Sequence, residues 1–577
     1  IPKRDWSSDV CSSDLLTYQS IRQYTGLVKL ETRITPNWLV TLFGTYTALH
    51  MNLNDTSGAT PSQIARYGKN FALQVTDPSL PNYAPYNRTN KWTDMDYLRI
   101  QGKVTDNLKI DNTGYTYAYT NETLTPTSVL STFNSATNVT SYLGIGGKAS
   151  PVVGGVTQAT GIAGYSKLNA YRVWGNIFRA STEYNLLGVS GEVRAGIWWE
   201  AASTPRARYD FDIRKCYELG INPFERVSTA CQDSSIATAK KAILTTGHPD
   251  PKRNGYAEYL EHSSWNQFQP FIEADIKPFE GLTVTPGAKY IDWVHSTRSI
   301  VEPKLLKPLV AEFKTTRVLP FFTANYKIQP SWSVYGQYAQ GIYIPDIKSF
   351  EQATTVTKFP AAQTTTNYQL GTVYYGDMFT IDADVYYIPV NNNIVFQDCA
   401  LAPVNGTKGE TCGVNTGQAV YKGIEGQATY AFGEDVLDGA LNGLVVFANG
   451  SYNYAKSGGV WLKQAPAWTA AGGLIYKRDG IKFSLIEKFV GPQYSDIVQN
   501  DLYRVPTYNN MDITLGYDFG KFEASIGVYN VLGSRSVLAI TENDKTTYQT
   551  DRLLSTDQYF FQPARSFMFT LKSNLTP

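Results

Sequence analysis

The residues in this chain whose chemistry is most specific are its cysteines, of which there are 5. Cys216 and Cys231 fall in one predicted loop, and Cys399 and Cys412 fall in another. Thiols that share a loop pair readily in an oxidising compartment, and closing a loop of about 15 residues is worth roughly 3 kcal/mol in the chain-entropy model. The pattern predicts a disulfide within each loop, with free thiols as the alternative. Cys11 belongs to an N-terminal segment of different character.

The histidines offer no catalytic or metal chemistry. His50, His248, His262 and His295 lie at or beyond the ends of predicted strands, and none has a metal-ligand spacing such as HxxxH. The sequence also contains no GxSxG, Walker or CxxC motif. Scattered surface histidines explain this distribution better than a metal cluster does. We therefore expect a protein that is not an enzyme and that has no catalytic residue, no metal site and no cofactor.

Aromatic and arginine side chains near the loops are the candidates for ligand binding. Aromatic rings and guanidinium groups suit bulky, anionic metal chelates. The candidates expected on a wet wall or in a loop are Trp198, Arg206, Arg208, Tyr335, Tyr338, Tyr343 and Trp461. For each aromatic residue the alternative is a place in the wall or in an interfacial girdle, and for each arginine it is a solvated loop.

Strands must position these residues, because alternation of apolar and polar residues with a period of two dominates from Tyr18 onward. The pattern is clear in segments 189–199, 268–276, 379–387 and 511–519. It places one set of side chains on an apolar face and the other on a polar face. We expect Ile272, Ala274, Ile513 and Leu515 to face lipid, and Glu273 and Asp512 to face a wet lumen.

The length of these runs distinguishes a membrane barrel from a soluble sandwich or propeller. Strands of soluble proteins average about 5–6 residues, whereas these runs extend over about 10–15, enough for a tilted membrane strand. Aromatic residues such as Trp199 and Tyr387 mark the ends of apolar faces, as an aromatic girdle requires. The fold class predicted is all-β, a transmembrane antiparallel β-barrel.

Composition agrees with this class. The chain has 577 residues, 18% of them charged, a formal net charge of +1 and 40 tyrosines. A protein that binds nucleic acid needs a basic surface, so nucleic acid is excluded as the main partner. The sequence has no apolar run long enough for a transmembrane helix, which takes about 18 residues or more.

The chain divides into two unequal parts. Residues 1–15 (IPKRDWSSDVCSSDL) are of low complexity and lack the apolar core of a signal peptide. They look like translated adapter sequence, so we expect a non-native segment there and a barrel domain over 16–577.

Short turns alternate with long polar stretches along the barrel domain. The long stretches are 52–92, 122–165, 204–260, 342–364, 391–418 and 532–565. Barrels of bacterial outer membranes have short periplasmic turns and long outer loops, and an even number of strands. We count about 19 strands, an odd number, and therefore expect that the first strands are missing.

Several stretches in the C-terminal half resemble the TonB-dependent receptors of Gram-negative bacteria. They are, in order along the chain, 326–345 (YKIQPSWSVYGQYAQGIYIP), 367–396 (NYQLGTVYYGDMFTIDADVYYIPVNNNIVF), 421–432 (YKGIEGQATYAF), 508–533 (YNNMDITLGYDFGKFEASIGVYNVLG) and 563–571 (PARSFMFTL). Each motif is weak alone, and together, in the family's order and at strand spacing, they are specific. Residues before about 310 match only in pattern.

The resemblance implies a plugged barrel of about 22 strands. It also implies import of scarce ligands, most often ferric siderophores, with energy delivered by the TonB complex. A member of this family would lie in the outer membrane as a monomer in contact with lipid. The plug and the TonB box are absent from the sequence here, which fits a truncated chain. The chain also ends on Asn574-Leu575-Thr576-Pro577 rather than on the aromatic residue usual in outer-membrane proteins.

Three functions are compatible with the sequence. A ligand-gated importer energised through TonB is the first. A passive, porin-like channel is the second and would lack a plug. A surface-structural barrel is the third and would carry outer extensions without a binding cavity.

Overall fold

The structure is a computed structural model of the whole chain. It describes residues 20–52, 83–126, 162–222, 256–301, 308–345, 360–398, 417–434, 436–495, 501–541 and 557–573, with short segments and single residues between them. No described helix is long and apolar enough to cross a membrane.

One antiparallel sheet of 21 strands makes up most of the fold. Its N-terminal half consists of β2 (Ser20–Thr35), β3 (Trp38–Asn52), β4 (Arg88–Lys103), β5 (Leu108–Pro126), β10 (Ala163–Leu186), β11 (Val189–Asp212), β12 (Tyr256–Lys277), β13 (Leu282–Val301) and β14 (Leu309–Gln329). The strands that follow are β15 (Trp332–Tyr343), β16 (Gln363–Tyr375), β17 (Phe379–Asn391), β20 (Gln418–Ala431), β21 (Leu444–Ser457), β23 (Trp468–Arg478), β24 (Ile481–Val490), β27 (Tyr508–Asp518), β28 (Phe522–Tyr529) and β31 (Ser566–Ser573). Each of these strands pairs with the next one named.

Smaller elements lie at the ends of the long strands and in the connections. The remaining strands are β1 (Ser12–Ser13), β6 (Ser131–Asn134), β7 (Val139–Tyr142), β8 (Val152–Val153), β9 (Val156–Thr157), β18 (Ile394–Asp398), β19 (Thr411–Asn415), β22 (Val460–Trp461), β25 (Gln493–Tyr494), β26 (Arg504–Val505), β29 (Val537–Thr541) and β30 (Gln558–Phe561). The helical elements include α2 (Ile213–Glu218) and the 3₁₀ turns η1 (Ala84–Tyr86), η6 (Leu437–Gly439) and η7 (Asp501–Tyr503).

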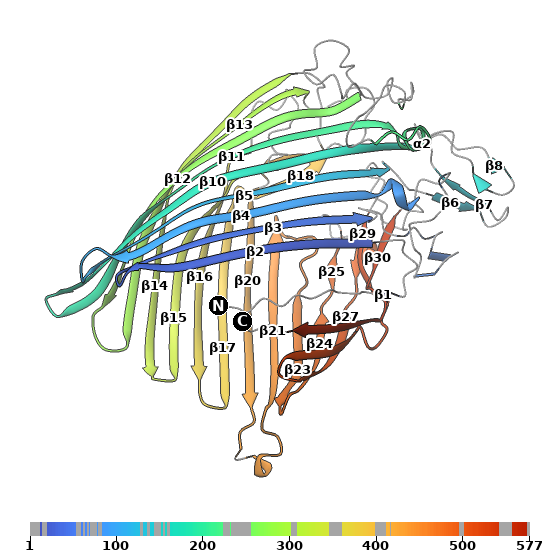
Figure 1. Cartoon of the computed structure of the whole chain (residues 1–577). Helices are drawn as coiled ribbons and strands as arrows, with labels where there is room; N and C mark the ends of the chain where they lie inside the picture. Colours follow the sequence, from blue (N-terminus) through green and yellow to red (C-terminus); the bar gives the residue numbers. More distant parts are fainter. Residues whose placement is uncertain are drawn as a thin grey trace.

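The sheet curves round into an open barrel (Figure 1). Among the described strands β2 pairs only with β3, so the sheet does not close between β2 and β31. The count of about 19 strands predicted from sequence differs from the 21 strands observed. The two-residue strands β1 and β22 pair with β31 and β21, and strands this short carry no alternation that sequence reading could detect.

Short turns lie at one end of the barrel, here called the turn end, and long connections lie at the other, the loop end (Figure 1). Leu187 and Gly188 join β10 to β11 with φ angles of +53° and +82°, and Asp479 and Gly480 join β23 to β24 with +50° and +83°. Two consecutive residues with positive φ form the type I′ turn, whose twist matches that of a β-hairpin.

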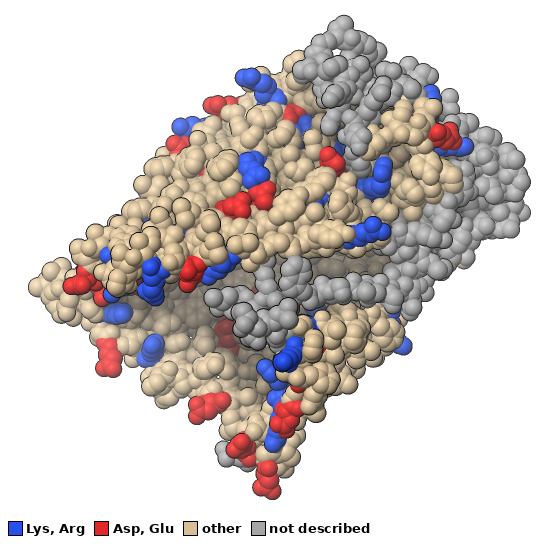
Figure 2. Space-filling view, in the orientation of Figure 1, with Lys and Arg blue, Asp and Glu red and all other residues tan. Residues whose placement is uncertain are grey.

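The two faces of the sheet differ in character. Ile272, Leu370, Leu515 and Phe569 are between 52% and 62% exposed on one face, here called the apolar face. Glu273 lies between Ile272 and Ala274 and therefore points to the opposite, polar face. Figure 2 shows a surface that is mostly uncharged, with charged side chains of both signs scattered over it. Period-two alternation therefore produced the two-faced wall that the sequence predicts.

The strands are of unequal length. β10 and β11 have 24 residues each, whereas β23 and β24 have 11 and 10. A tilted strand of about 9–11 residues crosses a membrane, so β10 and β11 extend well past that length toward the loop end. Arg206 and Arg208, expected in a loop, lie in this extension of β11. The expectation was wrong because the alternation of 189–199 continues through 206–211.

Candidate functional site on the polar face

A hydrogen-bonded aromatic cluster surrounds one buried carboxylate on the polar face. Trp198 donates from Nε1 to the Tyr115 hydroxyl at 2.7 Å, and this hydroxyl donates to Glu200 Oε2 at 2.7 Å. Trp265 donates from Nε1 to Glu200 Oε1 at 3.3 Å, and its ring stacks on Trp293 with centroids 5.8 Å apart. Trp198 is therefore on the face predicted for it, and both oxygen atoms of Glu200 are satisfied.

Nearer the loop end, a patch of polar residues spans β11, β12 and β13. Arg206 lies opposite Glu261, and Glu261 lies opposite Ser299. Thr204 lies opposite Ser263 in the adjacent row. We call these five residues the loop-end patch.

The contacts within the loop-end patch leave several atoms without a partner. Glu261 Oε1 accepts a hydrogen bond from Ser263 Oγ at 2.8 Å and contacts Arg206 Nη1 at 3.4 Å. Glu261 Oε2, Thr204 Oγ1 and Ser299 Oγ are buried and have no hydrogen-bond partner within the described part of the chain. A buried polar group without a partner costs roughly 1–3 kcal/mol. The patch therefore contains buried polar atoms whose hydrogen-bonding capacity the described residues do not use.

Arginine side chains at the loop end also lie over tyrosine rings. Arg206 lies 5.3 Å from the centroid of Tyr259, and Arg208 lies 4.0 Å from that of Tyr165. These distances are within the range of cation–π attraction. The two arginines predicted as ligand contacts are thus held in place by the wall itself.

The opposite wall bears carboxylates. Tyr335 donates to Asp384 Oδ2 at 3.4 Å, so Tyr335 lies on the polar face as predicted. Asp384 lies directly opposite Glu425 across the β17–β20 pair. Asp382, Asp384 and Glu425 border a hollow of about 470 Å³. Three or more His, Cys, Asp or Glu side chains in metal-binding geometry do not occur among the described residues.

A second hollow, of about 550 Å³, lies near the turn end. Arg194 is the centre of the charges beside it, with Asp275 at 2.7 Å, Glu192 at 2.9 Å and Glu273 also in contact. We call these four residues the turn-end cluster. Its arginine is saturated by carboxylates, which distinguishes it from the loop-end patch.

One predicted ligand contact, Tyr338, lies on the wrong face. Tyr338 pairs with Tyr368, which pairs with Tyr387, and the last two are 48% and 46% exposed on the apolar face. Tyr335 and Tyr338 are three residues apart in one strand, so they cannot share a face. Trp461 contacts Tyr454 on this same face at a centroid distance of 5.4 Å. Tyr338 therefore does not lie on the wet wall expected for it. Trp461 lies in β22, within the connection between β21 and β23, and its role in ligand binding stays a prediction.

Tyr343, the remaining predicted contact, is the last residue of β15. It lies an even number of residues from Tyr335 and therefore points to the polar face. Its side chain is 51% exposed. Its role in ligand binding stays a prediction.

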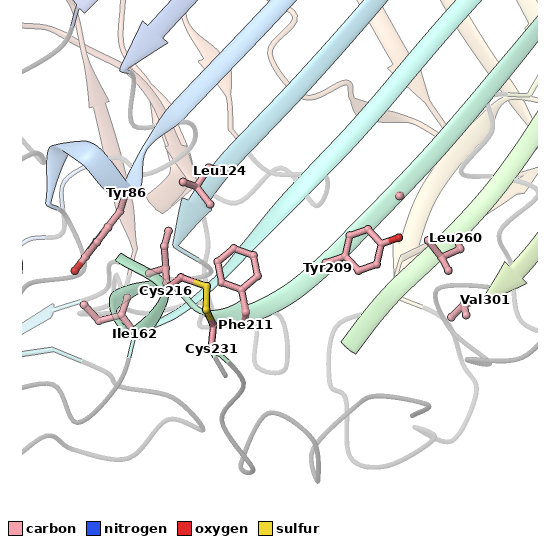
Figure 3. Packing of buried hydrophobic residues seen from close by; sticks show 11 residues of the cluster. Tyr86, Leu124, Ile162, Tyr209, Phe211, Cys216, Cys231, Leu260 and Val301 are labelled. Carbon is pink, nitrogen blue, oxygen red and sulfur yellow. A yellow bond between two sulfur atoms is a disulfide. The ribbon is translucent and has the colours of Figure 1, made fainter. Parts of the chain in front are cut away.

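One of the two predicted disulfides is present. Cys216, in α2, is bonded to Cys231, with Cα atoms 4.9 Å apart and a sequence separation of 15. Both cysteines pack into a buried apolar cluster with Phe211, Ile213 and Tyr86 (Figure 3). Cys399 lies outside the described residues, so its pairing with Cys412 stays a prediction.

The disulfide belongs to an apolar cluster on the opposite face of the strands that carry the loop-end patch. The same apolar cluster includes Ala207 and Leu260, the sequence neighbours of Arg206 and Glu261. Beside it Tyr83 shares a hydrogen bond of 2.9 Å with Tyr217, which raises the pKa of Tyr83 to about 12. The cluster and the patch occupy opposite faces of the same strand ends, so the disulfide helps to fix the patch.

Sequence reading missed the residues that organise this wall. Tyr115, Glu200 and Glu261 were not candidates, although each is inward by the parity of its strand. A buried carboxylate among aromatic residues was a detectable signal at Glu200, which follows Trp198 and Trp199. Glu261 gave no local signal, because its arginine comes from another strand.

A curved antiparallel sheet with one apolar and one polar face defines a membrane-type β-barrel. The family described as TonB dependent receptor-like, beta-barrel matches residues 30–531, and the chain belongs to this family. Barrels of this family lie in the outer membrane, and their polar face lines the lumen.

Curated relatives and solved structures agree with the family. The chain is 26% identical to the pesticin receptor of Yersinia enterocolitica over 224 residues, which are 38% of this chain and 32% of that protein. The segment thus spans about a third of that relative. The fold is similar to the unliganded ferric citrate transporter FecA, with a TM-score of 0.68, 14% identity and coverage of 96% of this chain and 71% of that one.

The ferric yersiniabactin uptake receptor FyuA of Yersinia pestis is also similar, with a TM-score of 0.63 and 14% identity, covering 99% of this chain and 74% of that chain. These relatives and neighbours are transporters and receptors, not enzymes. The expectation that the chain is not an enzyme is thereby confirmed.

Proposed function

We propose that this chain is the barrel of a ligand-gated importer of the outer membrane, energised through the TonB complex, with a ferric siderophore as its cargo. The observation that carries the proposal is the loop-end patch on the lumen wall of a family barrel. Buried polar atoms there lack partners among the described residues, and a bound ligand would supply them. The pesticin receptor and the ferric citrate and ferric yersiniabactin receptors support this cargo class by resemblance.

The wall also suggests how a ligand is held. Arg206 and Arg208 supply positive charge for an anionic chelate, and Trp198 and Tyr115 supply aromatic surface. A bulky chelate that enters at the loop end meets these groups first. The protein would act as a monomer surrounded by lipid, with TonB engaged through a plug domain.

Uptake of labelled ferric siderophore by iron-starved cells tests the proposal. Cells that carry the complete gene should accumulate iron only when TonB is present and the proton gradient is intact. Glu261→Ala and Arg206→Ala should each lower uptake at limiting ligand, and Glu312→Ala, on the apolar face, should not. Uptake that persists without TonB would overturn the importer and favour a passive channel.

A further inference from the structure

A row of aromatic side chains crosses the apolar face near the loop end. Tyr338, Tyr368 and Tyr387 are successive partners across β15, β16 and β17, and their ring centroids lie 5.4 Å and 6.3 Å apart. The same row continues to Lys422 in β20 and Tyr454 in β21. Tyrosine at the edge of an apolar face is typical of a membrane interface.

The row next to it, toward the turn end, is apolar. Leu370, Val385 and Ile424 are successive partners and are 62%, 47% and 53% exposed. Tyr452 follows them in β21 and is 60% exposed. A contiguous exposed band of this kind is the surface that meets hydrocarbon. The aromatic row therefore marks where the hydrocarbon region ends.

Two lysines lie where the aromatic row ends. Lys422 and Lys456 lie 4.7 Å and 5.1 Å from the ring centroid of Tyr454, and Lys456 lies 5.2 Å from that of Trp461. We call Lys422, Tyr454, Lys456 and Trp461 the lysine–aromatic patch. Neither lysine forms an ion pair with a described residue. Two ammonium groups thus share one tyrosine ring, and no carboxylate of the described residues forms an ion pair with either of them.

Two other cations of the apolar face, Arg172 and Lys314, differ in this respect. Arg172 contacts Asp94 at 2.6 Å, and Lys314 contacts Asp292 at 3.6 Å. Thr316 pairs with Asp292, and Asp292 pairs with Phe268, which is 44% exposed on the apolar face. Lys314 therefore has the same orientation as the two lysines of the patch but a neutralising partner.

We propose that the lysine–aromatic patch binds the headgroup phosphate of an anionic membrane lipid. The proposal rests on the membrane location contained in the proposed function. The patch continues the apolar band, so a lipid whose chains cover Ile424 and Tyr452 brings its headgroup to Lys422 and Lys456. Long lysine side chains extend from apolar surface to the headgroup layer, and clustered lysines attract anionic lipids. The rings of Tyr454 and Trp461 hold the ammonium groups in place.

Native mass spectrometry of the full chain in detergent tests this proposal. The chain is mixed in turn with phosphatidylglycerol, lipid A, phosphatidylcholine and inorganic phosphate. We expect the anionic lipids to be retained, and the variant with both Lys422→Gln and Lys456→Gln to lose this retention at least fivefold. Lys314→Gln is the matched control and should retain lipid as the wild type does.

Several outcomes would overturn the proposal. Equal retention by the double variant and the wild type would remove the patch as the site. Binding of inorganic phosphate as strong as that of the lipids would reassign it to a free anion. Retention of phosphatidylcholine equal to that of phosphatidylglycerol would show that the patch does not select a net anionic headgroup, and would overturn the proposal. A double variant that loses lipid but still imports siderophore supports the patch independently of transport. If the wild type shows no TonB-dependent uptake of ferric siderophore but still retains lipid, only the proposed cargo is rejected. The lipid site then still stands.

Discussion

The turn-end cluster and the loop-end patch face the same lumen yet use their charges differently. Arg194 contacts three carboxylates, with N···O distances of 2.7 Å to Asp275 and 2.9 Å to Glu192. Arg206 contacts Glu261 at 3.4 Å. Charge-assisted hydrogen bonds are usually about 2.7–2.9 Å long. The two Arg194 distances fall in this range, and the distance from Arg206 to Glu261 is longer. A saturated cluster stabilises a wall, whereas a patch with unused acceptors is suited to binding.

The support behind each region differs as well. Ala207 and Leu260, next to the loop-end patch in sequence, pack into an apolar cluster that a disulfide closes. The turn-end cluster faces away from Ile272, which is 56% exposed on the apolar face. The strand extensions at the loop end thus have a small apolar core of their own.

The largest expected effect comes from removing this support. Replacing both Cys216 and Cys231 by alanine should destabilise the loop end by about 3 kcal/mol, since the disulfide closes a loop of 15 residues. Hydrogen exchange measured by mass spectrometry should rise in the outer parts of β11 and β12. Exchange around Arg194 should stay as it is in the wild type. Equal increases at both ends would show that the two regions unfold together.

An intermediate effect is expected at the turn end. Arg194→Met leaves Glu192, Glu273 and Asp275 close together without their shared cation. Breaking a buried ion pair costs about 3–5 kcal/mol. The Arg194 side chain is 30% exposed, so we expect a smaller loss, about 2 kcal/mol, after screening by solvent. Urea unfolding in detergent measures it, and Arg194→Lys should recover part of the loss. If Arg194→Met left the free energy of unfolding unchanged, the cluster would not stabilise the wall.

The difference between these regions also shows what sequence reading could and could not find. Alternation gives the face of every residue once the strand is known, so Glu273 and Trp198 were placed on the polar side from sequence. The sequence reading failed for Tyr338 because an aromatic residue is suited both to a girdle and to a binding site. Only its odd spacing from Tyr335 in the same strand shows that the two tyrosines lie on opposite faces. The pairing of Arg206 with Glu261 depends on the register of β11 and β12, which are joined through a long connection. No local pattern encodes that register.

The disulfide illustrates the opposite case. Two cysteines in one predicted loop were sufficient to predict the bond between Cys216 and Cys231. Its packing against Phe211 and Tyr86 was not predictable, because Tyr86 comes from a distant connection before β4. Local chemistry could be read from the sequence, whereas contacts between distant segments required the fold.

The smallest expected effect is a change in the free energy of unfolding that differs in sign between two threonine-to-valine substitutions. Thr204 Oγ1 is buried without a described partner, whereas Thr285 Oγ1 donates to Asp275 Oδ1 at 2.8 Å. Valine has nearly the same shape as threonine and is equally suited to a strand. Thr204→Val removes an unsatisfied hydroxyl and should stabilise the unliganded chain by about 1 kcal/mol. Thr285→Val removes a hydrogen bond to a carboxylate and should destabilise it by about 1–2 kcal/mol.

Urea unfolding of the two valine variants in the same detergent measures this contrast. Thr204→Val should also weaken binding of the transported ligand, because the hydroxyl is then no longer available to it. Thr285→Val should leave binding unchanged, because the Thr285 hydroxyl is hydrogen-bonded to Asp275 of the turn-end cluster. Destabilisation by Thr204→Val would show that its hydroxyl has a partner in the unliganded chain. The loop-end patch would then be a satisfied wall of the same kind as the turn-end cluster.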